Sequence, residues 1–422
     1  MTFSMNNLDE AETECFRNND RFIPSRSFND EFASNYKISS CTSMTDIDEL
    51  PNNENVHYEK ILNQNFSNKK KSLQSMTDLD FKAEENLNAQ QSIHNRQIPK
   101  VPFKILDAPL LQDDFYLNVV DWGKSDLLAV GLGNAAYTWS YKTNTIDKIS
   151  QLEEFNLVTG IGWDQTGQLL GVGTLHGRVQ LWDINKNQNI ATFDDHYERV
   201  GSLSIFNNLL ITGSRDKAIK LRDIRMHKRL VATYKNHKQE VCGLKWSPDG
   251  QYFASGGNDN NLFVYSPKTI HPLMKKKHKA AVKAIAWSNK TSGLLASGAG
   301  TADKCVRLWQ VGERKLVGLR DTGSQICNII FSKHSDELIT THGFSNNEIN
   351  IWQLKGLKKS HTLLGHSSRV LYLSMSPDGE KIVTGAGDET LRFWNLNYPI
   401  PHEYNKVERK LNFSEMSLNA MR

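Results

Sequence analysis

Seven short segments with similar endings recur between residues 137 and 394 at an almost constant interval. Each segment closes an apolar run, and a large or basic side chain stands at its end. These closing residues are Trp139, Trp182, Arg222, Tyr265, Trp309, Trp352 and Trp394, and successive members lie 43, 40, 43, 44, 43 and 42 residues apart. Within one interval, Val241–Trp246 is an alternating apolar run, Ser247–Gly250 is a polar turn and Tyr252–Ser255 is a second run. Each unit therefore holds a few short strands that cannot bury their own faces alone.

A repeat of about 40 to 45 residues with four short strands per unit is typical of the WD-repeat β-propeller. Seven units stacked radially share a continuous core and protect most of their strand edges. The sequence therefore predicts an all-β, seven-bladed WD-repeat β-propeller in residues 99–398. It also predicts a disordered N-terminal tail in residues 1–98 and a C-terminal tail in residues 399–422.

Composition is the basis for predicting disorder in the N-terminal tail. Residues 1–98 contain 16 acidic and 10 basic residues and many Asn, without a sustained apolar period. Such a segment cannot bury enough surface to offset the entropy of ordering. Its net charge is about −6 and the whole chain carries +4, which leaves about +10 for residues 99–422. The basic residues are dispersed and lack interleaved aromatics, which favours acidic protein partners over nucleic acid.

Cysteine usage and hydropathy constrain the compartment. The five cysteines show no paired spacing, and Cys242, Cys305 and Cys327 lie in apolar runs. This pattern indicates small buried hydrophobic residues in a reducing compartment rather than disulfides or a metal site. The sequence shows neither a signal peptide nor an apolar run of about 18 residues. We therefore expect no membrane partner and a location in the nucleus and cytoplasm.

Histidine and aspartate residues recur at fixed places in the repeats and could be mistaken for catalytic pairs. They are His196, His237, His278 and His366, together with Asp216, Asp259, Asp303 and Asp388. In WD blades these residue types usually form a buried hydrogen-bond network with the terminal Trp, so we expect a structural role. Arg222 and Tyr265 replace that Trp in blades three and four, where the networks must differ. The sequence predicts no catalytic residue, no cofactor and no metal site.

Several longer segments resemble one family of WD-repeat proteins. They are Lys104–Pro109, Asp113–Trp122, Glu240–Asp249, Ser255–Asn260, Gly300–Asp303 and Gly385–Trp394. These segments resemble the Fizzy family, the co-activators and substrate receptors of the anaphase-promoting complex, a ubiquitin ligase. Three further segments are more similar to the Fizzy-related branch than to the mitotic Fizzy branch. They are Gln112–Asn118, Leu128–Gly133 and Asp321–Gln325.

The resemblance implies that both ends of the chain dock to the ligase. The residues that match the family's C-box are Asp20, Arg21, Phe22, Ile23, Pro24, Ser25 and Arg26. Pro24 restricts the backbone and lowers the entropy lost on binding, while Arg21 and Arg26 suit bidentate carboxylate contacts. Relatives finish in Ile-Arg, which binds the ligase scaffold, whereas this sequence finishes in Met421-Arg422. Met has a similar volume and is expected to fill an Ile pocket at modest cost.

The resemblance also implies two sites for degrons, the short motifs that mark substrates. Residues that match the site for the Lys-Glu-Asn degron are Asn258, Asn260, Thr301, Asn346 and Arg369. Amides and a hydroxyl suit this polar peptide, Arg369 can pair with its Glu, and Asn346 is shorter than the Gln of relatives. Asp114 and Glu389 match the carboxylates that receive the Arg of a destruction box between the first and last blades. Turn chemistry alone is the alternative for Asn258, Asn260 and Asp114.

Two features of the N-terminal tail concern regulation. Ser43–Asp48 recurs as Ser75–Asp80, and each copy joins Ser and Thr to downstream acids. Both copies are either helix starts, with a capping hydroxyl and early Asp, or a repeated partner or kinase motif. The tail contains no Ser-Pro or Thr-Pro, so the proline-directed phosphorylation usual in the family is not expected. Acid-directed phosphorylation, or control of the protein's supply, is predicted instead.

These observations together predict a non-catalytic adaptor that recruits substrates and activates the ligase to drive cell-cycle protein degradation. Its expected partners are subunits of the anaphase-promoting complex, degron-bearing substrates such as mitotic cyclins, and pseudosubstrate inhibitors. Two alternatives stay open at this point. One is a degron-binding pseudo-receptor or inhibitor that does not activate the ligase, and the other is a generic WD-repeat scaffold.

Overall fold

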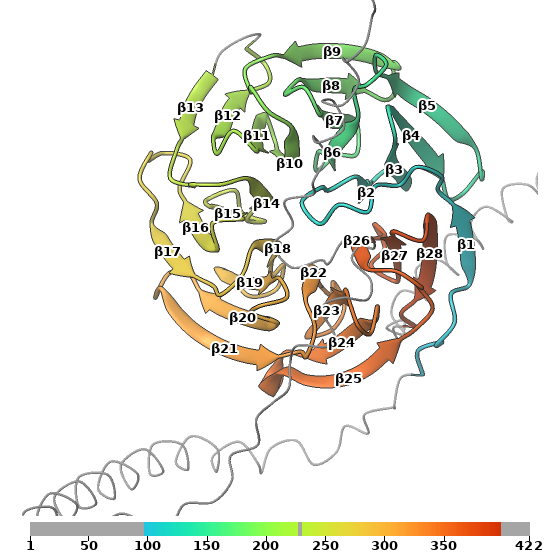
Figure 1. The fold of residues 1–422 in the computed structure, drawn as a ribbon, viewed down its shortest axis with the longest axis vertical. Coiled ribbons are helices and arrows are strands. Elements are labelled where there is room, and N and C mark those ends of the chain that lie inside the picture. Colours follow the sequence, from blue (N-terminus) through green and yellow to red (C-terminus); the bar gives the residue numbers. More distant parts are fainter. Residues whose placement is uncertain (1–96, 227–229, 398–422) are drawn as a thin grey trace, which may run out of the picture. The chain divides into compact units, whose positions relative to one another are not determined.

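The computed structural model describes residues 97–226 and 230–397. Within these ranges the chain forms seven four-stranded antiparallel sheets, arranged as blades around a common axis (Figure 1). The prediction of an all-β, seven-bladed propeller is confirmed. Apart from Gln97 and Ile98, the predicted tails lie outside the described residues, as do the C-box at 20–26 and the repeated segments at 43–48 and 75–80.

Six blades are built from four consecutive strands each. Blade one contains β2 (Val120–Trp122), β3 (Leu127–Leu132), β4 (Ala135–Ser140) and β5 (Ile146–Gln151). Blade two contains β6 (Val158–Trp163), β7 (Leu169–Thr174), β8 (Val179–Asp183) and β9 (Gln188–Phe193). Blade three contains β10 (Val200–Phe206), β11 (Leu209–Ser214), β12 (Ile219–Asp223) and β13 (Leu230–Tyr234). Blade four contains β14 (Val241–Trp246), β15 (Phe253–Gly257), β16 (Asn261–Tyr265) and β17 (Met274–Lys277).

The remaining blades complete the ring. Blade five contains β18 (Val282–Trp287), β19 (Leu294–Ala299), β20 (Cys305–Gln310) and β21 (Lys315–Asp321). Blade six contains β22 (Ile326–Phe331), β23 (Glu337–His342), β24 (Ile349–Gln353) and β25 (Lys358–Leu363), with the short 3-10 helix η1 (Lys355–Leu357) between its last two strands. Blade seven contains β26 (Val370–Met375), β27 (Lys381–Ala386), β28 (Thr390–Asn395) and, as its outer strand, β1 (Lys104–Asp107).

Burial falls from the axis of the ring to its rim. The inner strand β18 is buried at every position, whereas the outer strand β21 of the same blade is almost entirely exposed. An inner strand is covered by neighbouring blades on both faces and reads as a continuous apolar run. Outer strands are covered less and carry polar residues, as the Lys-rich β17 does.

The ring is closed by a strand from the other end of the propeller. β1 pairs antiparallel with β28, in the register Lys104↔Phe393 to Asp107↔Thr390. The first strand of the propeller therefore belongs to the last blade, and blades one and seven become neighbours (Figure 1). This arrangement leaves the chain between β1 and β2 free to run across the seam between those two blades.

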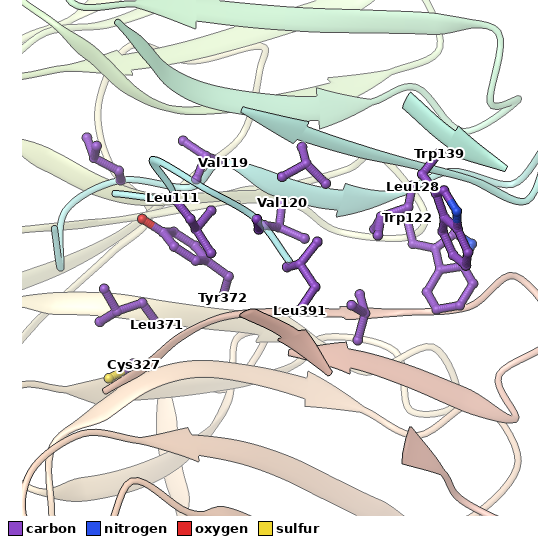
Figure 2. Packing of buried hydrophobic residues seen from close by; sticks show 14 of the residues in the cluster. Leu111, Val119, Val120, Trp122, Leu128, Trp139, Cys327, Leu371, Tyr372 and Leu391 are labelled. Carbon is purple, nitrogen blue, oxygen red and sulfur yellow. The ribbon is translucent and has the colours of Figure 1, made fainter. Parts of the chain in front are cut away.

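A shared hydrophobic cluster seals this seam. Leu111, from the connection between β1 and β2, packs with Trp122 of blade one and with Tyr372 and Leu391 of blade seven. Figure 2 shows Leu111 beside Tyr372, Leu391 opposite Val120, and Trp122 at the other end of the cluster beside Trp139. Buried apolar area of this kind contributes about 25 cal/mol per Å² to stability, so the connection is fixed by burial and not only by its polar contacts.

The repeated His and Asp residues form the expected buried networks. In blade five, His278 Nδ1 lies 3.0 Å from Asp303 Oδ2, and His278 Nε2 lies 3.1 Å from Ser297 Oγ. Trp309 Nε1 donates to the same hydroxyl at 2.8 Å. Blade seven repeats the arrangement with His366, Asp388, Thr384 and Trp394. Their structural role is therefore sufficient to explain their spacing.

Blades three and four depart from this pattern at the predicted positions. The Tyr265 hydroxyl donates to Asn236 Oδ1 at 3.2 Å and also contacts Ser255, the hydroxyl that His237 reaches. Arg222 forms an ion pair with Asp195 and lies over the ring of Phe193, 4.7 Å from its centroid. The basic side chain thus finds both a carboxylate and an aromatic face where other blades have the terminal Trp.

Candidate ligand-binding site

One face of the ring gathers all the described candidate residues. In each blade the loop before the first strand and the turn after the second strand lie together, because those strands are antiparallel. In blade four, for example, Val241 pairs with Gly257, and the amide of Asn258 donates to the carbonyl of Glu240 at 2.8 Å. These loops and turns carry the predicted degron-binding residues.

Residues 112–118, which we call the strap, lie in the connection between β1 and β2. On one side, the Tyr372 hydroxyl of blade seven donates to the carbonyl of Gln112 at 2.6 Å. On the other, Asn118 Nδ2 donates to the carbonyls of Gly201 and Cys242, each at 2.9 Å, in blades three and four. The strap therefore crosses from blade seven to the far side of the ring.

Arg369 is held by the strap. Its Nε donates to Asp113 Oδ1 at 3.2 Å, and its Nη2 donates to the Asp113 carbonyl at 3.1 Å. The Arg369 guanidinium also lies 5.5 Å from the centre of the exposed Phe344 ring. The whole Arg369 side chain is only 6% exposed and is held by Asp113, so its position is set before any ligand binds. The sequence did not single out Asp113, although it stands directly before Asp114.

Asp114 points away from Asp113 and toward blades three and four. Its Oδ2 accepts Arg199 Nη1 at 2.6 Å, and its Oδ1 accepts the amide of Tyr116 at 2.8 Å. Arg199 also reaches Glu240, with Nε to Oε1 at 2.7 Å and Nη2 to Oε2 at 3.0 Å. Burial opposes charge on Arg199, but hydrogen bonds with Glu240 and Asp114 and their negative charges outweigh it and raise the pKa of the guanidinium.

The amides of the fourth blade lie beside this ion pair. The Tyr116 hydroxyl of the strap donates to Asn258 Oδ1 at 3.2 Å, and its backbone amide donates to Asp114, so Tyr116 joins Asn258 and Asp114. Asn260 has a φ of +64°, and its Nδ2 donates to the carbonyl of Lys279 at 3.3 Å. Asn tolerates this left-handed conformation, so turn chemistry explains the residue type. The side chain is half-buried, and its amide is directed to the loop before β18.

Thr301 and Asn346 extend the polar surface across blades five and six. Thr301 Oγ1 donates to Gln325 Oε1 at 2.8 Å, which adds a Gln amide that the sequence did not select. Asn346 Nδ2 lies 3.4 Å from Glu348 Oε1, at the limit of a hydrogen bond. Thr301 and Asn346 are both exposed, whereas Gln325 and Glu348 beneath them are buried.

Glu389 lies at a turn of the last blade. It occupies the turn between β27 and β28 with a φ of +57°, and its carbonyl accepts the amide of Ala108 at 2.8 Å. The exposed Asp107 pairs with Thr390, the residue after Glu389, in the β1–β28 register, so the backbone of Asp107 lies beside the Glu389 turn. Asp114 contacts Arg199 and Tyr116, and Tyr116 contacts Asn258, whereas none of these contacts involves Glu389.

The contacts that sequence reasoning missed are all long-range. Four residues that the sequence did not select contact a predicted residue from another loop. Asp113 contacts Arg369, Arg199 contacts Asp114, Glu240 contacts Asn258 and Gln325 contacts Thr301. The Asp113-Asp114 dipeptide was the one available signal of these contacts. Two adjacent carboxylates repel each other, which favours separate cationic partners such as Arg369 and Arg199. Met421 and Arg422, like the C-box, lie outside residues 97–226 and 230–397. Among the described residues, no group of three or more His, Cys, Asp or Glu could hold a metal ion, and no helix is long and apolar enough to cross a membrane.

A seven-bladed ring with charged and amide side chains clustered on one face defines a WD-repeat protein built for interaction. The chain belongs to the Fizzy family, since the family model described as the CDC20/Fizzy WD40 domain matches residues 106–394. Protein FIZZY-RELATED 1 of Arabidopsis thaliana is 50% identical over 312 residues, which cover 74% of this chain and 66% of that protein. This likeness confirms the Fizzy-related branch.

Two further comparisons agree with the family assignment. The anaphase-promoting complex subunit cdh1 of Dictyostelium discoideum is 43% identical over 339 residues, covering 71% of this chain and 44% of that protein. A chain in a crystal structure of a mitotic checkpoint complex superposes with a TM-score of 0.71 at 37% identity, covering 74% of this chain and 96% of that one. The match spans less than two thirds of the length of both named relatives.

Proposed function

We propose that this protein is a substrate-recognition and activating subunit of the anaphase-promoting complex, and that it drives cell-cycle protein degradation. Membership of the Fizzy family and the likeness to a relative named as a subunit of that complex support the proposal. The observation that carries it is the strap, whose neighbouring acids Asp113 and Asp114 engage Arg369 and Arg199 and gather the predicted residues on one face. A generic scaffold has no need of this arrangement.

The Lys-Glu-Asn degron is proposed to bind across the strap. Asn258 and Asn260 offer amides, Thr301 a hydroxyl and Arg369 a guanidinium for the Glu of the peptide. Asn346, at the edge of this surface, supplies a weaker contact because its side chain is short. The contact of Tyr116 with Asn258 favours including Asp114 here, where its carboxylate suits the Lys of the degron.

The destruction box is proposed to bind along the seam between blades one and seven. Glu389 keeps the role that the sequence assigned to it, as one carboxylate for the Arg of this degron. The register that places Asp107 opposite Thr390 favours Asp107 as its partner. Asp114, which the sequence paired with Glu389, is proposed for the Lys-Glu-Asn site instead, because Tyr116 links it to Asn258.

The protein's own role is proposed to be non-catalytic, so that ubiquitin transfer belongs to the ligase. Docking is assigned to the C-box at Asp20–Arg26 and to Met421-Arg422, and the site of action to the nucleus and cytoplasm. Mitotic cyclins and other degron-bearing proteins are the proposed substrates. Pseudosubstrate inhibitors that occupy the same face are a further class of partner.

Ubiquitination of a destruction-box substrate by ligase that lacks a co-activator tests this proposal. Wild-type protein should restore activity, and the Arg21→Ala, Arg26→Ala variant should not, although it binds degron peptides as tightly as wild type. If wild type bound the peptides but restored no activity, the protein would be an inhibitor instead. The replacement of Ile by Met421 would then be the first change to reverse, with Met421→Ile.

A further inference from the structure

We infer that Arg199 and Glu240 are positioning residues for degron binding, which fix the strap against Asn258 and set the charge of that part of the face. The inference rests on the proposed function and deepens it. Neither residue is proposed to touch the degron. Both act through Asp114 and the strap backbone.

The geometry makes Arg199 a clamp between two loops. Its guanidinium is only 14% exposed and reaches Asp114 of the strap and Glu240 of the loop before β14 at the same time. Glu240 is 7% exposed and takes two of the Arg199 donors in a bidentate contact. A planar guanidinium suits this fork geometry, and a Lys ammonium does not. The strap is therefore tied to the rigid edge of blade four.

The clamp is coupled to the predicted degron residues through Tyr116. The Asp114 carboxylate that pairs with Arg199 also caps the Tyr116 amide, and the Tyr116 hydroxyl reaches Asn258. The strap backbone has little freedom here, because a Cβ at Gly201 would lie 2.9 Å from the Tyr116 carbonyl oxygen. Release of Asp114 from Arg199 should therefore disorder the strap around Tyr116 and withdraw its contact from Asn258.

The clamp also determines the local charge. Asp114 and Glu240 are two carboxylates that share the Arg199 guanidinium beside Asn258, and the further positive charges close to them are Lys283 for Asp114 and Arg215 for Glu240. Asp113 and Arg369 on the other side of the strap balance each other. A ligand with a cation near one end and an anion further along, as in Lys-Glu-Asn, matches this distribution, and its affinity should fall with added salt.

A double variant tests the clamp and leaves only the part-exposed Asp114 without its ion-pair partner. Arg199→Met with Glu240→Gln removes both partners of the buried contact, and Tyr116→Phe removes only the hydroxyl that reaches Asn258. In the full-length protein, we expect the double variant to bind a fluorescent Lys-Glu-Asn peptide at least 10-fold more weakly, with less than a twofold change for a destruction-box peptide. Tyr116→Phe should lose about threefold for the first peptide only. Arg199→Lys should also bind the Lys-Glu-Asn peptide more weakly than wild type, because an ammonium cannot make the bidentate contact with Glu240.

Amide exchange provides a readout that general destabilisation would not reproduce. Exchange in the double variant should quicken at residues 113–118 while β14 and β18 keep their protection. Equal losses for both peptides, unchanged affinity for the Lys-Glu-Asn peptide, or unchanged exchange in the strap would each overturn the inference. Failure of wild-type protein to bind either peptide would instead overturn the proposed function, and strap exchange would still decide whether the clamp positions the strap.

Discussion

Glu389 occupies a backbone conformation that residues with side chains rarely adopt. Its φ of +57° lies in the left-handed region, and it sits at an exposed turn where Gly or Asn would be the ordinary choice. An L-residue pays about 1 to 2 kcal/mol in this region. The same turn has a positive φ at Lys217 and Lys304 in other blades, so the conformation belongs to the turn, and the proposed role of this carboxylate rests on its position.

Glu389→Gly should therefore stabilise the protein while weakening one ligand. Relief of the left-handed strain, less the entropy cost of Gly, gives a net gain of about 0.5 kcal/mol in the free energy of unfolding. Loss of a charge-assisted hydrogen bond should weaken destruction-box peptides by about 10-fold. Denaturant unfolding and peptide titration measure the two effects. Glu389→Asn is the matched control, since it keeps a side chain suited to the turn and should lose the same affinity.

Lys283 is a second residue whose environment has a measurable consequence. It lies on β18 and is only 3% exposed, with Nζ donating to the Leu371 carbonyl at 3.0 Å. Its ammonium also lies 5.1 Å from the Tyr372 ring centre and 5.5 Å from that of Phe115 in the strap. Burial is the largest effect and lowers the pKa of Lys283 to about 8. The charged form is therefore disfavoured in the folded protein.

The stability of the protein should depend on pH through this group. Between about pH 8 and the ordinary Lys value of 10.5 the unfolded state binds the proton and the folded state does not. Stability from this group therefore rises with pH across that window, by about 1 kcal/mol per pH unit. Burial raises the pKa of the Cys242 and Cys327 thiols, so their contribution falls in the same alkaline range.

Comparison with Lys283→Met isolates the lysine. The cysteine contribution is common to both proteins, so the difference in the free energy of unfolding, measured in urea from pH 7 to 10.5, should grow in favour of wild type as the pH rises. A constant difference would show that Lys283 keeps an ordinary pKa in the folded state.

The closing strand β1 is the element on which the ring depends most. It supplies the outer edge of blade seven through its pairing with β28, and Phe103 packs near Phe393 with ring centres 6.2 Å apart. Leu106 packs against the cluster that seals the seam between blades one and seven. Without β1, the fully buried Phe393 would lie at an open sheet edge.

Removal of β1 should cost several kcal/mol. A chain that begins at residue 108 loses the β1–β28 ladder, at about 1 kcal/mol per hydrogen bond, together with the burial of Leu106. Its Tm should fall by roughly 5 to 10 °C relative to a chain that begins at residue 97, which keeps the strand. Differential scanning calorimetry of the two chains measures the change. Equal Tm values would mean that β1 does not close the ring in solution.

Elements and contacts differ in how far the sequence could predict them. The number of blades follows from the spacing of Trp139 to Trp394, because each blade is local in the chain and repeats one burial pattern. The contact between Arg199 and Asp114 joins residues 85 positions apart, and that between Arg369 and Asp113 joins residues 256 apart. No period encodes these pairs, since they depend on the path that one connection takes across the finished ring.

At the scale of the whole molecule, the ring holds the two proposed degron sites in one body. Asn258 and Asn260 of the proposed Lys-Glu-Asn site belong to blade four, whereas Glu389 and Asp107 of the proposed destruction-box site belong to blade seven. Both lie on loops of the same face, and the packed blades of the closed ring leave little freedom for their separation to change. A substrate with both degrons can therefore gain from binding at two fixed points, provided that the chain between its degrons can span them.

A peptide that carries both degrons should bind far more tightly than either motif alone. Once one motif is bound, the other experiences an effective concentration set by the linker, which predicts a gain of about 10² to 10⁴ in affinity. With Gly-Ser linkers the gain should pass through a maximum, because a short linker cannot span the sites and a long one dilutes the second motif. Titration of a linker series against wild type measures this maximum, and peptides with one scrambled motif are the controls. The advantage should vanish in Arg369→Ala and also in Glu389→Ala, because each substitution removes one point of attachment. A gain that survived either substitution would mean that the two motifs do not use separate sites on this face.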